Sequence, residues 1–221
     1  YKIWLSEIML QQTQVTTMSP YYIKWINKYP NIKSVLSVPY EIILKSWEGL
    51  GYYSRCKNFY DALKIVDNVY RGIVPKDYKK FSELPGVGEY TASAVLSIAY
   101  NKNYFVIDGN VKRVFSRYLG IKKLTRYNVS RIKNYLNNLI QLTNSGVFNQ
   151  SIMEIGAILC KKNDPKCYQC PLKTNCIANL NKSPQLYPAN IKKNKLKTEK
   201  YVGLILRNKN KFIIMKNKKR L

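Results

Sequence analysis

The chain has 221 residues, of which 46% are hydrophobic, and 38 lysine and arginine residues against 12 aspartate and glutamate residues give it a net charge of +26. This length suffices for a sizeable core and one or two domains. The excess of positive charge indicates a polyanionic partner, nucleic acid by default, although a composition rich in Lys, Asn, Ile and Tyr also suggests codon drift that raises lysine everywhere. Because no run of eighteen apolar residues and no cleavable leader is present, we expect no membrane span and a cytoplasmic, soluble protein.

The first predicted helix covers residues 3–17, and Glu7 is its only charged side chain. At 100° per residue, the neighbours on its face are mostly uncharged and partly apolar, so desolvation should raise the pKa of the carboxyl. Such a group suits a general acid near neutral pH. The alternative is a solvated glutamate on a helix surface, the usual place for this residue type. The chain opens with Tyr1, not Met, directly in this apolar pattern, so we expect an N-terminal fragment.

The next segments predict further helices and one exposed turn. Pro20 is expected to start a second helix, and Pro30 and Pro39 to punctuate two shorter ones. The glycine-bounded turn at residues 47–55 carries Tyr52, which can either cover the core or wedge into a stack of bases.

A longer amphipathic helix is predicted from Arg55 to Tyr70. Its apolar residues at helical spacing should face the core, and they are Phe59, Leu63, Val66 and Val69. Cys56 has no nearby cysteine partner and is expected to be a free thiol.

The stretch from Leu84 to Gly88, with the sequence LPGVG, predicts a turn between helices, because proline lacks a backbone donor and two glycines free the backbone. Gly86, Val87 and Gly88 directly precede an apolar helix, so their amides could approach a phosphate, with added attraction from the helix dipole. This pattern is typical of a helix-hairpin-helix, a motif that holds the DNA backbone without reading bases. The alternative is an ordinary helical corner that contains glycine.

Asp108 follows that helix and opens another, which carries Lys112 and Arg113. An isolated aspartate before Gly109 and Asn110 is most simply a helix N-cap. A negative charge between a phosphate-binding hairpin and a basic helix would, however, repel DNA unless the chemistry required it. Cleavage of a glycosidic bond does, since a carboxylate stabilises the oxocarbenium-like sugar.

Two more helices are expected at residues 127–142 and 146–160, and Glu154 is the only charge in the second. Four cysteines with the spacing C-x6-C-x2-C-x5-C then follow, namely Cys160, Cys167, Cys170 and Cys176. Four cysteines this close argue for a metal centre over disulfides. Because the chain has no histidine, a mixed zinc site is impossible, and the compact spacing fits thiolates around an iron–sulfur cubane.

The last part of the chain changes character. Residues 188–200 are basic and lack apolar periodicity, which predicts a linker. Residues 201–207 and 211–216 predict two strands of a β-hairpin. Two strands are not stable alone in water, so we expect them to begin a further domain.

Several of these motifs resemble the MutY family of adenine DNA glycosylases, within the helix-hairpin-helix, Gly/Pro-rich, Asp superfamily. They are LSEIMLQQTQV, WEGLGYYSR, the hairpin with VIDGNVKRV, and the cysteine run, and the resemblance extends from Tyr1 to about Pro188. It implies an all-α fold with a six-helix domain (residues 1–104) and a helical [4Fe-4S] domain (105–187). A basic linker (188–200) and the first hairpin of a truncated nudix-like domain (201–221) would follow.

The resemblance also implies a function. The protein would act as a monomer on double-stranded DNA that contains A:8-oxoguanine or A:G mispairs, without a membrane partner. Glu7 would protonate the adenine ring, Asp108 would support the sugar cation, and water would complete the hydrolysis. The implied DNA- and base-binding residues are Gln12, Thr13, Leu50, Tyr52, Gly86, Val87, Gly88, Asn110, Lys112 and Glu154, and the four cysteines would hold a [4Fe-4S] cluster.

Tyr90 bears on the reaction type. Proteins that resemble endonuclease III have a lysine there, which attacks the sugar and nicks the strand, whereas tyrosine cannot form an imine. We therefore expect a monofunctional glycosylase in which Tyr90 positions other groups, with a weak nick through Lys112 as an open alternative. Structurally, Tyr90 could also be a mere aromatic at a helix start, and Glu154, implied to accept from the adenine amino group, a buried structural residue.

Two other functions remain open at this point. One is a glycosylase/lyase like endonuclease III, against which Tyr90 and Glu7 argue. The other is a non-catalytic DNA-binding remnant of the fold, because a Trp-Arg pair of the family lies upstream of this chain.

Overall fold

The protein is seen here in a computed structural model, which describes residues 1–189, 207–208 and 211–212. Two units divide the chain, Tyr1–Ala189 and Asn190–Leu221. The described part of the first unit is helical without a strand, which confirms the predicted all-α class.

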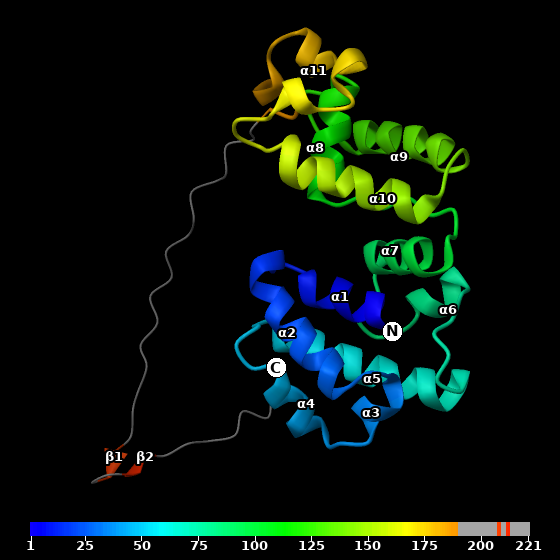
Figure 1. Cartoon of the computed structure of the whole chain (residues 1–221), viewed down its shortest axis with the longest axis vertical. Helices are drawn as coiled ribbons and strands as arrows, with labels where there is room; N and C mark the ends of the chain where they lie inside the picture. The colour runs from blue at the N-terminus through cyan, green and yellow to red at the C-terminus, as the bar shows by residue number, and fades with distance from the viewer. Residues whose placement is uncertain (190–206, 209–210, 213–221) are drawn as a thin grey trace. The chain divides into compact units, whose positions relative to one another are not determined.

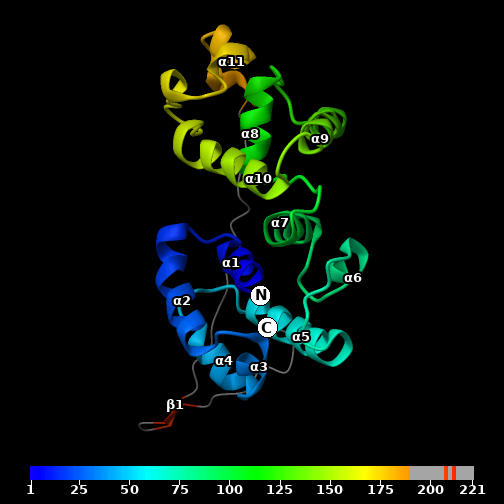
Figure 2. The same ribbon diagram turned by 45° about the vertical axis from the view of Figure 1, so that its right-hand side comes forward.

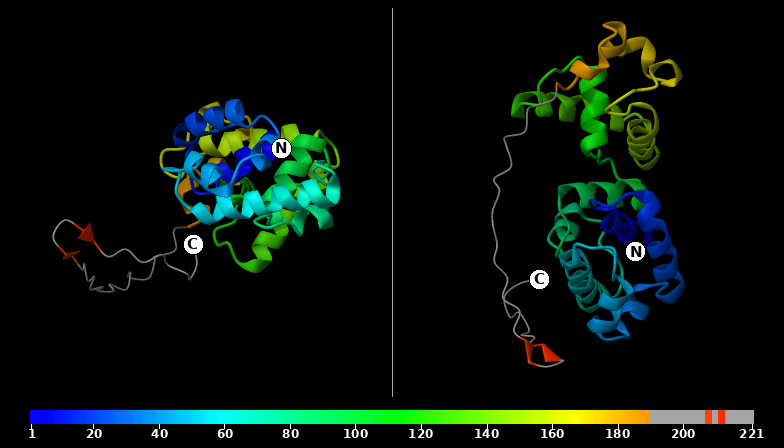
Figure 3. Two further views of the ribbon diagram at one scale, coloured as in Figure 1. Left: turned by 90° about the horizontal axis from the view of Figure 1, so that it is seen from below. Right: turned by 90° about the vertical axis from the view of Figure 1, so that its left-hand side faces the viewer.

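The first group of helices packs around three tryptophans. Trp25 and Trp47 meet edge to face with ring centroids 5.6 Å apart, and Trp4 meets Phe59 in the same way at 5.0 Å. Helix α1 lies inside this group, in contact with α2, α5 and α7 (Figure 3). The helices of the group are α1 (Lys2–Leu10), α2 (Val15–Lys28), α3 (Ile32–Leu36), α4 (Tyr40–Ser46), α5 (Tyr53–Tyr70), α6 (Tyr78–Ser82) and α7 (Glu89–Tyr100).

A second group surrounds a smaller apolar cluster that includes Val114, Phe115 and Leu136. Its α-helices are α8 (Gly109–Tyr118), α9 (Arg126–Ile140), α10 (Ser145–Glu154) and α11 (Ile177–Leu180). Four short helical turns complete it: the π-helix η1 (Ile155–Leu159) and the 3-10 turns η2 (Cys167–Gln169), η3 (Lys173–Asn175) and η4 (Pro184–Leu186). The last buried residue of the first apolar cluster is Leu96, and the first of the second cluster is Val111. The predicted domain boundary at residue 104 lies between them.

The two groups meet where α7 runs beside α10 (Figures 1 and 2). Gly146 permits this close approach, because a Cβ there would come within 2.8 Å of the Ser97 carbonyl oxygen. The buried Asn149 amide donates to Ser97 Oγ and to the Tyr104 carbonyl at 2.8 Å each, and its Oδ1 accepts from the Val106 amide. A single α10 side chain therefore fixes the segment that leads to Asp108.

The prediction of one helix over residues 3–17 was wrong. Helix α1 ends at Leu10, Gln12 has φ +56°, and α2 begins at Val15, so Pro20 lies inside α2 and does not start it. The cause is Arg55, which donates to the carbonyls of Ile8, Met9 and Gln11. A continuing helix would need these same carbonyls.

The other helix predictions agree with the structure with small differences. The two short helices after Pro30 and Pro39 and the helix ending at Tyr70 are confirmed, and Cys56 is a buried free thiol. Val69, predicted to be core, is 64% exposed, because it lies at the edge of the buried face in the last turn of α5. The helix expected over 146–160 changes from α to π geometry at Ile155.

In the second unit, β1 (Arg207–Asn208) pairs antiparallel with β2 (Lys211–Phe212). These pairs agree with the predicted hairpin, whereas the remainder of its strands and the linker at 190–200 lie outside the described residues. A search of the described helices for one with the length and apolar character to cross a membrane finds none.

Candidate active site

Glu7 is buried in the first group, as its sequence neighbours predicted, with 7% of its surface exposed. Its Oε2 has no hydrogen-bond partner among the described residues. Burial raises the pKa of the Glu7 carboxyl, hydrogen bonding with the Tyr90 hydroxyl acts in the opposite sense, and the nearby Asp108 charge raises it further. The solvated-surface alternative is therefore wrong. A buried carboxyl with a free oxygen is costly for a fold, and such groups cluster at functional sites.

Asp108 is the N-cap of α8, as predicted. Its Oδ1 accepts from the Val111 amide at 2.7 Å, and its Oδ2 accepts from the Asn110 side-chain amide at 3.0 Å. Asn110 is in turn held by Arg113, whose Nη2 donates to Asn110 Oδ1 at 2.7 Å. The carboxylate is therefore fixed in orientation on both oxygens, and capping does not exclude a chemical role.

Tyr90 brings the two acids and the second group together. It lies in the first turn of α7, and its hydroxyl donates to the Met153 sulfur of α10 at 3.7 Å. Burial, followed by the charge of Glu7, raises the pKa of the Tyr90 phenol, so it remains a neutral donor. Because Asp108 also acts on both groups, the structure gathers the three predicted catalytic residues in one place.

Glu154 and Lys112 differ in their surroundings. Glu154 ends α10 and is exposed, so the alternative of a buried structural glutamate is wrong. Lys112 is half-buried on α8, one turn after Asp108. The roles implied for both residues stay predictions.

The hairpin has the predicted geometry. Gly86 has φ +75°, and a Cβ there would come within 2.8 Å of Asn58 Cβ. The Val87 side chain is buried and its amide donates to the Leu84 carbonyl. Gly88 caps α7 with open space around it, since a Cβ there would meet nothing within 4 Å. The first amides of α7 lack intrahelical acceptors, so an anion can approach them.

Two further loops lie beside the hairpin. Gln12 and Tyr52 are exposed and both have positive φ, at +56° and +49°, whereas Leu50 is buried. Thr13 Oγ1 accepts from Arg55 at 3.4 Å. Gln12, Tyr52 and Gly86 line one cavity together with Arg55. The structure thus gathers three of the segments implied to meet DNA.

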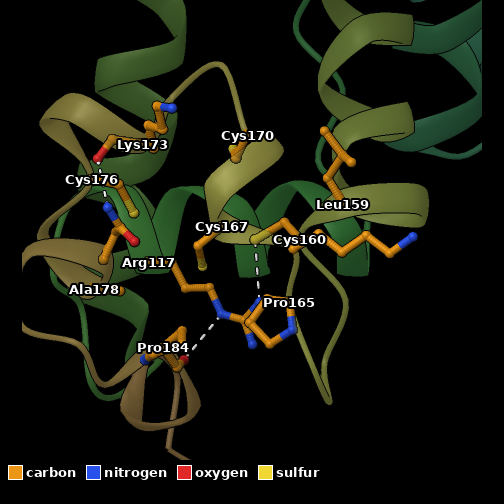
Figure 4. A pocket seen from close by; sticks show the side chains of 12 residues that line it. Arg117, Leu159, Cys160, Pro165, Cys167, Cys170, Lys173, Cys176, Ala178 and Pro184 are labelled. Carbon is orange, nitrogen blue, oxygen red and sulfur yellow. Dashed lines mark hydrogen bonds between the residues drawn. The ribbon is translucent and has the colours of Figure 1, made fainter.

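The four cysteines Cys160, Cys167, Cys170 and Cys176 line a second, small cavity of about 20 Å³ (Figure 4). Burial, and then the charges of the neighbouring cysteines, raises the pKa of the Cys167 thiol. In the described part of the chain, no three His, Cys, Asp or Glu side chains are close enough together to hold a metal ion. Four cysteine thiolates are nevertheless the donor set of an iron–sulfur cluster.

Arg117 provides an independent test of that fit. It is only 3% exposed, and none of the described ion pairs involves it. Its Nη1 donates to Cys160 Sγ at 3.3 Å and its Nε donates to the Pro184 carbonyl at 3.0 Å (Figure 4). Further bonds reach the carbonyls of Lys161 and Lys162. A buried cation without a carboxylate needs another negative charge nearby. Four thiolates around a cluster supply one, so the residues present fit a [4Fe-4S] cluster.

Sequence reasoning missed three arginines with structural roles, namely Arg55, Arg113 and Arg117. Each donates several hydrogen bonds to backbone carbonyls far along the chain. Arginine accounts for only eight of the 38 basic residues. Arginine has a planar fork of donors that lysine lacks, but the sequence carries no signal that separates these three from Arg71, Arg126 and Arg131, which are exposed.

Comparison with known proteins gives a consistent result. Residues 5–142 match the HhH-GPD superfamily, described as base excision DNA repair proteins. The chain is 42% identical to an adenine DNA glycosylase of Buchnera aphidicola subsp. Baizongia pistaciae over 98% of its length and 62% of that protein. It is 38% identical to the Homo sapiens adenine DNA glycosylase over 80% of its length and 33% of that protein. The chain thus spans less than two thirds of these relatives.

Solved structures agree on the fold. A thermostable thymine-DNA glycosylase superposes with a TM-score of 0.73 at 30% identity, covering 82% of this chain and 84% of that one. A non-covalent endonuclease III–DNA complex gives a TM-score of 0.68 at 21% identity, covering 81% and 84%.

Proposed function

The chain belongs to the HhH-GPD superfamily of base excision DNA repair proteins, and on that premise we propose that it is an adenine DNA glycosylase. Its substrate is adenine paired with 8-oxoguanine or guanine in double-stranded DNA, and its product is an abasic site. The relatives at 42% and 38% identity are both adenine DNA glycosylases, which supports this choice within the superfamily.

The observation that carries the proposal is the state of Glu7. Its buried carboxyl has a raised pKa and an oxygen without a protein partner. A protonated acid at this position gives its proton to the imidazole-side ring nitrogen of adenine flipped out of the duplex. The glycosidic electron pair then leaves with the protonated base.

Asp108 and Tyr90 complete the reaction. As the C–N bond breaks, the sugar becomes an oxocarbenium-like cation, which the nearby Asp108 carboxylate stabilises. Water adds to the sugar carbon and loses one proton to the solvent, which leaves the hydroxyl group of an abasic site. Tyr90 positions Glu7 and, having no amine, forms no imine with the sugar, so the strand stays intact.

The DNA is held by elements outside this acid pair. The hairpin at Gly86–Gly88 and the start of α7 bind backbone phosphate, and the charge of +26 attracts the duplex from a distance. We propose that the four cysteines hold a [4Fe-4S] cluster whose contribution is structural: it fixes the segment with Lys161, Lys162, Lys166 and Lys173 toward phosphate. The protein acts as a monomer in the cytoplasm.

The test is the single-turnover release of adenine from a duplex with A opposite 8-oxoguanine, for the parent and for Glu7→Gln. We expect release by the parent, strand breakage only after alkali, and no release by the variant. The matched control is Glu89→Gln, a 70% exposed carboxylate at the start of α7, which should behave as the parent does.

Three results would contradict the proposal in different ways. Strand breakage without alkali, with a borohydride-trapped adduct, would indicate a lyase like endonuclease III. Binding of the duplex without release by a folded, cluster-loaded parent would indicate a non-catalytic remnant of the fold. Equal release by parent and Glu7→Gln would remove Glu7 from its proposed role.

A further inference from the structure

Arg55 makes more hydrogen bonds than any other side chain in the described part of the molecule, and nothing in the proposed chemistry uses it. Arg55 lies in the first turn of α5, and only 8% of the residue is exposed. It makes six hydrogen bonds, to the carbonyls of Ile8, Met9, Gln11, Leu50 and Gly51 and to Thr13 Oγ1.

These acceptors belong to two separate loops. The first is the break between α1 and α2, where Arg55 Nη1 reaches Gln11 O at 2.6 Å. The second is the turn before α5, where Nη2 reaches Gly51 O at 3.1 Å. The guanidinium also lies over the rings of Trp47 and Tyr52, at 5.6 and 5.4 Å from their centroids.

Both loops carry strain that Arg55 offsets. Gln12 and Tyr52 have left-handed backbone conformations that L side chains rarely adopt. The last carbonyls of α1 carry the negative end of its dipole, and the Ile8 carbonyl accepts only a 3.4 Å bond from the Gln11 amide, so a buried cation stabilises them. Without this cation, α1 could continue toward α2, which is what its sequence alone predicts.

The loops face the same cavity, which also reaches Asn58 and Gly86 of the hairpin region. Gln12 and Thr13 are implied to lie near the base opposite adenine, and Tyr52 to enter the stack beside it. The distance between these two elements must therefore match the duplex. Arg55 is the described side chain that bonds to both.

We propose that Arg55 is a positioning residue that sets the Gln12–Thr13 loop and the Tyr52 turn in register with each other, and thereby determines how well the protein distinguishes the base opposite adenine. The inference rests on the proposed function. It assigns Arg55 to selection of the mispair and not to the breaking of the glycosidic bond.

The experiment measures duplex affinity with an uncleavable adenine analogue opposite 8-oxoguanine, opposite guanine, and in an undamaged duplex. Arg55→Met should weaken binding of the 8-oxoguanine duplex by about tenfold, because the two loops are then no longer held in register and must be ordered at the cost of binding free energy. Affinity for undamaged DNA should not change, because phosphate contacts lie elsewhere. Arg55→Lys, which keeps the charge but not the planar fork, should be intermediate.

The matched control is Leu63→Ala, a fully buried residue two turns further along α5 that does not line the cavity shared by the two loops. It should lower the melting temperature without changing the ratio of affinities. The inference would be overturned if Arg55→Met left the ratio of affinities for 8-oxoguanine and undamaged duplexes unchanged. It would also be overturned if Leu63→Ala lowered that ratio as much as Arg55→Met does. If Arg55→Met does not fold, Arg55→Lys against Leu63→Ala makes the same comparison.

A second readout does not depend on catalysis. A 2-aminopurine beside the mispair changes its fluorescence when Tyr52 enters the stack, whatever base is excised. The parent and Leu63→Ala should give this change and Arg55→Met should not. A parent without preference for any mispair would refute the proposed function, and equal fluorescence changes in the parent and Arg55→Met would separately refute the role of Arg55.

Discussion

The side-chain amide of Asn110 donates to Asp108 Oδ2 at 3.0 Å, while the backbone amide of Val111 occupies Oδ1 at 2.7 Å. Asn110 is itself fixed by Arg113, which also donates to the carbonyls of Gly156 and Cys160. The orientation of the aspartate therefore depends on a side chain that reaches the first cysteine of the candidate cluster.

A substitution of Asp108 by asparagine can separate its role as a helix cap from its proposed role in the reaction. Asparagine caps helices about as well as aspartate, so Asp108→Asn should change the free energy of unfolding by less than about 0.5 kcal/mol. The loss of the negative charge should nevertheless lower the single-turnover rate by about 100-fold or more. Thermal denaturation beside adenine release checks both parts, and Asp108→Ala, which loses the cap, should cost about 1 kcal/mol.

Replacement of Asn110 should disturb the orientation of Asp108 without removing its charge. We expect Asn110→Ala to lower the rate of adenine release by about tenfold through misalignment. Duplex affinity measures the alternative, since the resemblance implies that Asn110 itself meets DNA. A fall in affinity with an unchanged rate at saturation would favour that direct contact.

Glu7 should make the fold less stable as pH rises. Its pKa is raised in the folded state above the ordinary 4.5, so the folded protein binds more protons than the unfolded one at the same pH. This group therefore carries no penalty below about pH 4.5, and the penalty grows as pH rises from there through the folded pKa. Glu7→Gln removes it.

The measurement is the melting temperature of the parent and Glu7→Gln between about pH 5.5 and 8.5. The variant should be the more stable protein, and its advantage should increase with pH over the range set by the raised pKa. A constant difference would show that Glu7 titrates normally. Glu89→Gln, at an exposed site, is the control.

The cysteine cavity predicts a selective effect of cysteine removal. Cys167→Ala should lose iron and the visible absorption of the cluster, and limited proteolysis should then cleave within residues 155–187. The first group of helices has its own apolar cluster and should resist. Cys56→Ala is the control, because burial raises the pKa of the Cys56 thiol to about 12 and keeps it unreactive.

Because position 90 holds tyrosine and not lysine, we expect no covalent intermediate between the protein and the DNA sugar. Borohydride added during turnover should trap no protein–DNA adduct, since Tyr90 offers no amine. If an adduct forms, Lys112→Gln identifies its source: its disappearance would place a weak lyase activity at Lys112, one turn from Asp108. Its persistence would require another amine.

The sequence predicted those features that depend on near neighbours. The cap at Asp108 follows from the residues directly after it, and the burial of Glu7 from the uncharged face of its own helix. The break after Leu10 could not be predicted in this way, because it depends on Arg55, 44 residues from Gln11. Asn149 and Arg117 likewise act on segments more than 40 residues away.

Helical spacing wrongly predicted that Val69 is part of the core. Val69 continues the helical spacing of Phe59, Leu63 and Val66, but successive steps of three residues rotate it away from the buried face. The π-helix after Glu154 was equally unpredictable, since Arg113 of α8 binds its Gly156 carbonyl.

The contact of α7 with α10 has a consequence for genetics. Glu7 and Tyr90 belong to the first group of helices, whereas Asp108 is carried by the segment that Asn149 holds from the second. A change at Gly146 or Asn149 would move one acid away from the other. In a screen for elevated mutation frequency, such interface variants should therefore be recovered together with changes at the acids themselves, although their phenotype originates in helix packing.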